Sequence, residues 1–336
     1  MIASLPDLLR LVAVPALGWA AWRDLQVRRV PNRLWYPLAA LGAVLLVWEG
    51  WSVLAAPDPT GYRRRLFLVQ VAVSLGVVVP LSYLVWRVGG FGGADAKALM
   101  ALAVLFPTVP TYAVPPLGGG PDVVFPLTAA TLGAFSLTVL TNTVVVAMGY
   151  PLALVGRNLL AGNVSPLMIV GTRVPTDSIP DRHGSLLETP DGWTRRGLDV
   201  DALRMYLRWR ETSLAELRAD PARFRDPASL PDDPAQPGDG AIADGGVPEG
   251  ASGQVDDASA TAPDDAWGAE AFLADVPHAW GTTPDDLRDG LEVLTTRDAV
   301  WYSPGIPFVV PMFLGLVTAL VYGDLLVSAM LAVGLV

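Results

Sequence analysis

The chain contains a series of long apolar stretches, each bounded by short polar turns. A stretch of about 20 apolar residues is long enough to cross the hydrocarbon core of a membrane as a helix. On this basis we predict six membrane-spanning helices. Their ranges are 5–22, 34–56, 66–86, 98–117, 125–150 and 304–336. The predicted fold class is therefore an all-α polytopic membrane protein.

A polar segment, 157–303, interrupts this pattern before the last predicted span. Short apolar runs broken by proline and glycine at 164–188 predict a small strand-rich element, and helical periodicity at 199–219 predicts a helix. Residues 220–290 are acidic and rich in proline, glycine, alanine and serine, a composition that favours disorder. We therefore expect a partly disordered soluble insertion between two membrane parts. The three parts are 1–156, 157–303 and 304–336.

Basic residues indicate which loops of a membrane protein lie on the cytoplasmic side. Arginines cluster directly after the first predicted span, so we assign that loop to the cytoplasm and the N-terminus to the outside. These arginines are Arg23, Arg28, Arg29 and Arg33. The arginine run 63–65 follows the second predicted span and contradicts this orientation. We retain the assignment because the order of the remaining spans supports it and because loop 107–122, expected outside, has no basic residue. With this orientation and number of spans, the insertion lies in the cytoplasm.

The composition of the chain excludes several classes of chemistry. Cysteine is absent, which excludes disulfide bonds, thiol nucleophiles and cysteine-bound zinc. The formal net charge of -10 argues against nucleic-acid binding, which requires basic surfaces. The two histidines, His183 and His278, lie in the insertion, so serine-type and zinc-dependent intramembrane proteolysis lack their residues. We predict no metal and no cofactor, which leaves carboxylates as the reactive groups.

Four acidic residues lie in or beside the predicted spans, and their depth separates them into two sets. Asp24 and Asp95 fall at cytoplasmic ends, whereas Glu49 lies near an outer end. Asp324 lies about 17 residues beyond Pro307, or about 26 Å further along a helix, so we expect it near the opposite face in a structural role. Two carboxylates in contact share a proton, and one then acts as base and the other as acid. Such a pair can activate water toward a peptide carbonyl.

Two short motifs surround these two acids. The first is Asp24 followed by Arg29-Val30-Pro31-Asn32, and the second is Gly92-Gly93-Ala94-Asp95 followed by Lys97. At these residues, and at Pro304-Gly305-Ile306-Pro307-Phe308, the sequence resembles the archaeal type IV prepilin and preflagellin peptidases, class III signal peptidases of the GxGD aspartic protease group. Ala94 stands where the short pattern has its second glycine. The resemblance covers the predicted spans but not the insertion.

The resemblance implies a function, a location and a set of site residues. Asp24 and Asp95 would be the catalytic pair of an aspartic endopeptidase that removes the short leader from prepilin-like or archaellin precursors at the cytoplasmic face of the cell membrane. The implied substrate-binding or supporting residues are Gly92, Gly93, Lys97, Arg29, Pro31 and Asn32. The implied partners are these precursors and membrane lipid. Because Lys97 lies about 200° around a helix from Asp95, we expect it to orient the loop or reach lipid phosphate rather than contact the acid pair.

Other functions can use the same acids. A relative of presenilin or signal peptide peptidase would cut helices inside the membrane, but we would expect more spans and a different motif at its first aspartate. A proton-coupled transporter also uses membrane carboxylates. Transporter sites tend to lie near the midplane at a repeat interface, whereas these acids lie at one edge and no repeat is visible. An inactive membrane scaffold organised by the insertion would require 220–290. The sequence predicts no oligomeric state.

Overall fold

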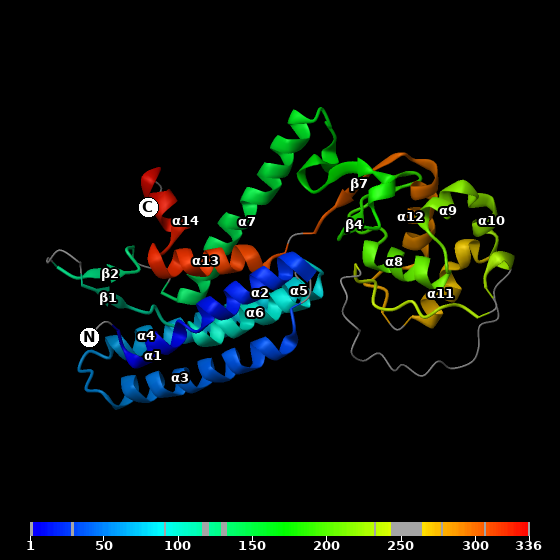
Figure 1. Cartoon of the computed structure of the whole chain (residues 1–336). Helices are drawn as coiled ribbons and strands as arrows, with labels where there is room; N and C mark the ends of the chain where they lie inside the picture. The colour runs from blue at the N-terminus through cyan, green and yellow to red at the C-terminus, as the bar shows by residue number, and fades with distance from the viewer. Residues whose placement is uncertain are drawn as a thin grey trace. The chain divides into compact units, whose positions relative to one another are not determined.

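The structure is a computed structural model of the chain. It describes residues 3–27, 30–90, 92–115, 121–128, 133–231, 233–242, 264–276, 278–305 and 307–334. Figure 1 shows that helices dominate these residues. The chain divides into two compact units, which we call the helical unit (Met1–Tyr150 with Pro307–Val336) and the inserted unit (Pro151–Ile306).

The helical unit is built from helices and one short strand pair. Its helices are α1 (Leu5–Arg10), α2 (Ala13–Val27), α3 (Trp35–Ala55), α4 (Tyr62–Val73), α5 (Val79–Arg87), α6 (Gly93–Leu105), the first part of α7 (Phe135–Leu160), α13 (Val309–Val321) and α14 (Leu325–Ala332). A 3₁₀ turn, η1 (Asn32–Leu34), leads into α3, and a π-helical turn, η2 (Ser74–Val78), joins α4 to α5. The strands β1 (Tyr112–Val114) and β2 (Val123–Phe125) pair antiparallel.

Three helices among the described residues are long and apolar enough to cross a membrane, and a fourth crossing results if the bent pair α13–α14 is one span. The three are Asn32–Ala55, Tyr62–Arg87 and Phe135–Leu160. The first predicted range is divided at Leu11 and Val12 because Pro15 has no N–H for the carbonyl of Leu11. The fourth predicted range is too long, since α6 ends at Leu105 and 112–114 is a strand. The count of six spans therefore stays a prediction.

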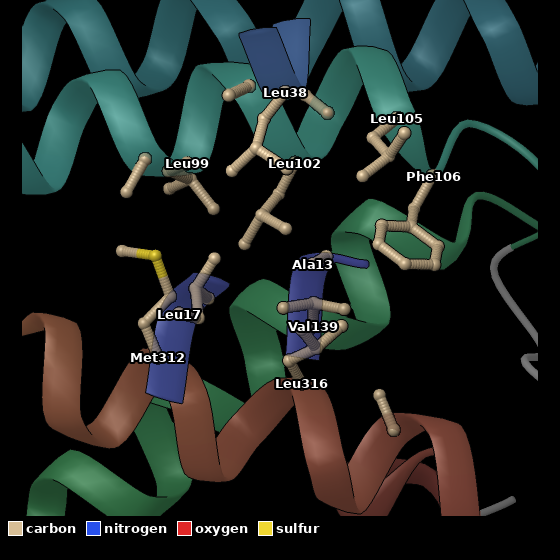
Figure 2. Packing of buried hydrophobic residues seen from close by; sticks show 14 of the residues in the cluster. Ala13, Leu17, Leu38, Leu99, Leu102, Leu105, Phe106, Val139, Met312 and Leu316 are labelled. Atoms are coloured by element: carbon tan, nitrogen blue, oxygen red, sulfur yellow. The ribbon is translucent and has the colours of Figure 1, made fainter. Parts of the chain in front are cut away.

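α6 forms the centre of the helical unit. Its residues Leu99, Leu102 and Leu105 are fully buried, and α2, α3, α7 and α13 pack around them. Figure 2 shows these leucines between Leu38 of α3 on one side and Leu17 of α2 on the other, with side chains of α7 and α13 completing the cluster. Burial on all sides explains why 13 residues suffice for this helix, because its stability comes from packing against protein.

Two glycines allow helices of this unit to approach closely. A Cβ atom on Gly42 of α3 would lie 2.8 Å from the backbone of Leu105, and one on Gly315 of α13 would lie 2.7 Å from the backbone nitrogen of Thr143 in α7. No side chain fits at such distances, so both crossings require glycine. The Gly42 contact fixes the end of α6 against the middle of α3.

A buried ion pair lies where α1, α3 and the end of α6 meet. The guanidinium of Arg10, only 1% exposed, donates two hydrogen bonds of 2.7 Å to the carboxylate of Glu49, one from each terminal nitrogen. Its Nε donates to the carbonyl oxygen of Leu105, and one terminal nitrogen also donates to Asp7. The carboxylate and carbonyl acceptors offset the cost of burying the arginine charge.

α13 and α14 are separated by a 66° bend at Tyr322–Asp324. Gly323 adopts a φ of +108°, and a Cβ there would lie 2.3 Å from the carbonyl oxygen of Thr128. Asn142 of α7 donates to the carbonyl of Gly323 and accepts from the N–H of Leu325. Asp324 is buried and caps α14 by accepting from the N–H of Val327. This supports the structural role predicted for Asp324.

The inserted unit combines a small sheet with helices around a separate core. The antiparallel sheet has the order β3 (Thr172–Pro175), β7 (Ala299–Ser303), β4 (Ser185–Leu186), and β5 (Glu188–Thr189) pairs with β6 (Gly192–Trp193). The helices are α8 (Val200–Trp209), α9 (Leu214–Ala219), α10 (Pro221–Arg225), α11 (Ala269–Asp275) and α12 (Pro284–Thr296). The helix predicted at 199–219 is confirmed as the pair α8 and α9.

Parts of the segment 220–290, for which the sequence predicts disorder, are helical in the structure. Residues 221–225, 269–275 and 284–296 are helical, and Trp267, Phe272 and Leu287 are buried in the core of the inserted unit. The prediction relied on the acidic composition of the segment. It did not take into account these buried apolar residues or the N-cap that Thr283 supplies to α12. Residues 243–263 lie outside the described residues.

Candidate active site

Three helix ends meet at one end of the helical unit. α2 ends there, and α6 and α13 begin there (Figure 1). Asp24 lies in the last turn of α2 and is 9% exposed, and Asp95 lies in the first turn of α6. α13 packs along α2, which brings Val309 to the same end. Residues far apart in the sequence thus share one site.

The first turn of α6 fixes the carboxylate of Asp95. Its Oδ2 accepts a hydrogen bond of 3.0 Å from the N–H of Gly92, the N-cap residue. A Cβ on Gly92 would lie 2.8 Å from that same oxygen, so a side chain at this position would displace the carboxylate. The backbone before the motif turns at Gly89, which has a φ of +74°. The glycines of this segment therefore hold the acid in place.

Two groups from other helices act on the carboxylate of Asp95, the negative charge of Asp24 and the backbone N–H of Val309. The charge of Asp24 acts on the Asp95 carboxylate, so the two acids lie within electrostatic range of each other. The backbone N–H of Val309 also approaches this carboxylate, from the first turn of α13. The positive end of a helix stabilises an anion. The sequence motif at 304–308 gave no sign of this contact, although Pro307 marks a helix start.

The remaining predicted site residues fall into three groups. Lys97 and Asn32 lie together, because the Nζ of Lys97 donates a hydrogen bond of 2.9 Å to the Oδ1 of Asn32. Pro31 precedes Asn32 as the N-cap of η1. A Cβ atom on Gly93 would lie 3.6 Å from the indole nitrogen of Trp86. Arg29 lies outside the described residues. The expectation that Lys97 orients the loop agrees with its contact to Asn32.

Glu49 and Asp324 are not part of this group, since each has the separate structural partners described above. Within the described ranges, no three histidine or carboxylate side chains are grouped so that they could hold a metal ion. The arrangement can supply a proton acceptor and a proton donor beside each other. The fold and the site together define a helical protein with an acid pair at the end of its bundle.

Comparison with known proteins links the chain to a family. Residues 11–152 match the type IV leader peptidase family, and residues 278–325 match the archaeal peptidase A24 C-terminus, type II. The first match contains both Asp24 and Asp95, and the second contains Val309. The chain is similar to the type IV leader peptidase family over these residues, and it is a membrane protein. The resemblance seen in the motifs is thus confirmed.

A curated relative points in the same direction. The chain is 28% identical over 156 residues to the prepilin peptidase EppA of Methanothermobacter thermautotrophicus. This similarity covers 46% of the chain and 37% of the relative, so the match spans little more than a third of that relative's length. No solved structure matches the chain.

Proposed function

We infer that this chain is an aspartic-type membrane endopeptidase that removes the leader peptide from prepilin-like precursors. The observation that carries this proposal is the juxtaposition of Asp24 and Asp95 at one end of the helical unit, in a chain similar to the type IV leader peptidase family. The similarity to a prepilin peptidase supports the substrate class. No cofactor enters the proposed reaction.

The reaction requires the pair to hold one proton. The ionised carboxylate takes a proton from water, and the resulting hydroxide attacks the carbonyl carbon of the scissile peptide bond. The protonated partner gives its proton to the carbonyl oxygen, which produces a tetrahedral diol. When the C–N bond breaks, one diol proton returns to the pair and the leaving nitrogen takes a proton from it. The pair ends with the single proton that it had at the start.

The substrate has to be extended at the bond that is cut, because a helix engages its carbonyl groups in its own hydrogen bonds. The position of the acids at a bundle end suits a leader segment next to a membrane helix. Exposed polar groups beside the pair, such as Lys97 and Asn32, support access from water at this end.

The proposed topology has six crossings, formed by α1–α2, α3, α4–α5, α6, α7 and α13–α14, with the acid pair and the inserted unit in the cytoplasm. Because the chain lacks cysteine, single cysteines can report on sidedness. A membrane-impermeant maleimide should label Asp122→Cys in intact cells and Asp191→Cys only after lysis. Both positions are exposed. The opposite labelling pattern would reverse the orientation.

The activity is tested with a prepilin precursor and membranes that contain the full chain. Asp24→Asn and Asp95→Asn should each lower cleavage by about 10²-fold to 10⁴-fold, because each removes one proton-transfer group. Asp122→Asn is the matched control, since it removes an exposed carboxylate of the helical unit away from the pair. If either Asp24→Asn or Asp95→Asn cleaves at the parent rate, the proposed mechanism is wrong.

A further inference from the structure

We propose that Lys97 and Asn32 form a positioning pair that holds the start of α3 in register with the start of α6, and thereby keeps Asp24 and Asp95 together. The catalytic consequence rests on the proposed function, whereas the effect on the spacing of the two acids does not. Lys97 is proposed here as a positioning residue, because within the protein it donates to Asn32 of the neighbouring motif.

The hydrogen bond between the two residues connects the two motifs directly. The Nζ of Lys97 and the Oδ1 of Asn32 are 2.9 Å apart, although the residues are separated by 65 positions in the sequence. Lys97 lies two residues after Asp95 in α6. Asn32 is the first residue of η1, and η1 continues directly into α3. Asn32 follows α2, the helix that carries Asp24, in the sequence. The bond therefore links α6, two residues after Asp95, to the turn that begins eight residues after Asp24 in the sequence.

This bond and the Gly42 contact hold the same two helices at two separate levels. α3 and α6 run in the same direction, with Lys97 near Asn32 and Leu105 against Gly42. Lys97 and Leu105 are eight residues apart, or about 12 Å along a helix. The hydrogen bond adds a polar constraint at the start of both helices to the apolar packing of α3 against α6. The level that includes the acids is the one held by Lys97.

The first turn of α6 itself contributes little apolar packing, although Trp35 at the start of α3 is buried in the core. Apart from Asp95 and Lys97, the residues from Gly92 to Ala98 are glycine or alanine. These side chains bury little apolar area, so they contribute little to helix docking. Larger buried side chains begin at Leu99. A polar link outside the core therefore has more influence on the start of α6 than it would have further along the helix.

The test measures the spacing of the acids without catalysis. In the full chain, Asp24→Cys with Asp95→Cys introduces the only two thiols, because the parent has no cysteine. A short bifunctional thiol reagent then cross-links them in native membranes. Adding Lys97→Met or Asn32→Leu should lower the initial cross-linking rate by at least about fivefold, since each removes one partner of a charge-assisted hydrogen bond.

Two further variants make the result specific. The exchange of partners, Asn32→Lys with Lys97→Asn, should restore cross-linking to within about twofold of the parent, because the donor and the acceptor are both present again. Arg87→Met removes an exposed cation at the end of α5 and should leave the rate unchanged. The proposal is overturned if Lys97→Met and Asn32→Leu cross-link at the parent rate, or if the exchange is no better than the single variants.

A kinetic measurement on the acid-intact chain separates positioning from substrate binding. Lys97→Met should lower kcat for precursor cleavage and leave KM within about twofold, because a misplaced acid pair weakens only the chemical step. A rise in KM with unchanged kcat would assign Lys97 to substrate binding and refute the positioning role. If the chain has no peptidase activity at all, the proposed function fails, while the cross-linking experiment still decides on the positioning pair.

Discussion

The N–H of Gly92 and the Oδ2 of Asp95 are joined by a hydrogen bond of 3.0 Å, and a Cβ on Gly92 would lie only 2.8 Å from that oxygen. Gly92→Ala should therefore displace the Asp95 carboxylate from its position and lower precursor cleavage by at least about tenfold, because small misplacements of catalytic groups are costly. Gly149→Ala in α7 is the control, since a Cβ there meets nothing within 4 Å. Equal activity of the two variants would contradict this role of Gly92.

The buried pair of Arg10 and Glu49 predicts a large effect on stability. Glu49→Ala leaves the guanidinium of Arg10 buried without its bidentate partner, and we expect a loss of about 3 kcal/mol in the free energy of unfolding. Thermal or denaturant unfolding of the detergent-solubilised protein measures this loss. Arg225→Ala removes an ion pair to Glu292 that is 58% exposed on the arginine side, and should cost less than about 1 kcal/mol.

Asp324 provides a contrast with the catalytic pair. Asp324→Asn keeps an oxygen that can accept from the N–H of Val327, so precursor cleavage should remain close to that of the parent. Asp324→Ala loses the cap of α14 and should lower stability by about 1 kcal/mol. A loss of cleavage in Asp324→Asn as deep as in Asp24→Asn, with the protein still folded, would show that Asp324 takes part in the chemistry.

The inserted unit should have a pH-dependent stability that depends on Asp199. Burial and the neighbouring charge of Asp201 raise the pKa of Asp199 to about 6, while Arg204 partly opposes this shift. Arg204 forms an ion pair with Asp201, and His183 lies 3.4 Å from the same carboxylate. Between about pH 4, near the ordinary pKa of an aspartate, and about pH 6, near the raised pKa, the folded state binds more protons at Asp199 than the unfolded state.

The stability of the inserted unit therefore falls as the pH rises through about 6, because Asp199 then has to be buried in its ionised form. Asp199→Asn removes this cost and should raise the free energy of unfolding at pH 8 by up to about 3 kcal/mol, with little change at pH 4. Asp191→Asn, at an exposed turn, is the control. Equal effects of Asp199→Asn at both pH values would refute the assignment.

The acids were visible in the sequence because a membrane chain contains few polar groups, and each has to be explained. Asp24 and Asp95 could be selected on that ground, and their approach in the structure agrees with the choice. Hydropathy gave α3 and α4–α5 to within about four residues, whereas the span predicted at 125–150 is placed ten residues too early for α7, because 123–125 form a strand. The catalytic role of Asp24 and Asp95 stays a prediction until the variants are measured.

Contacts between distant segments could not be read from the sequence. The bond from Lys97 to Asn32 and the approach of Val309 to Asp95 depend on how helices pack, and no local pattern encodes them. Average hydropathy overestimated α6, because an apolar run predicts burial but does not reveal where the helix ends. In the insertion, the prediction gave more weight to the acidic composition than to a few apolar residues such as Trp267. The helices that pack around these residues were therefore not predicted.

The length of α6 has a consequence for how water reaches the acids. Its 13 residues rise about 20 Å, whereas the hydrocarbon layer of a bilayer is about 30 Å thick. A helix that short spans about two thirds of that depth, and because other helices enclose α6, protein and not lipid lines the remaining depth of roughly 10 Å. Water would then approach the acids inside the protein, and turnover would depend on the packing of the helix bundle rather than on the thickness of the host lipid.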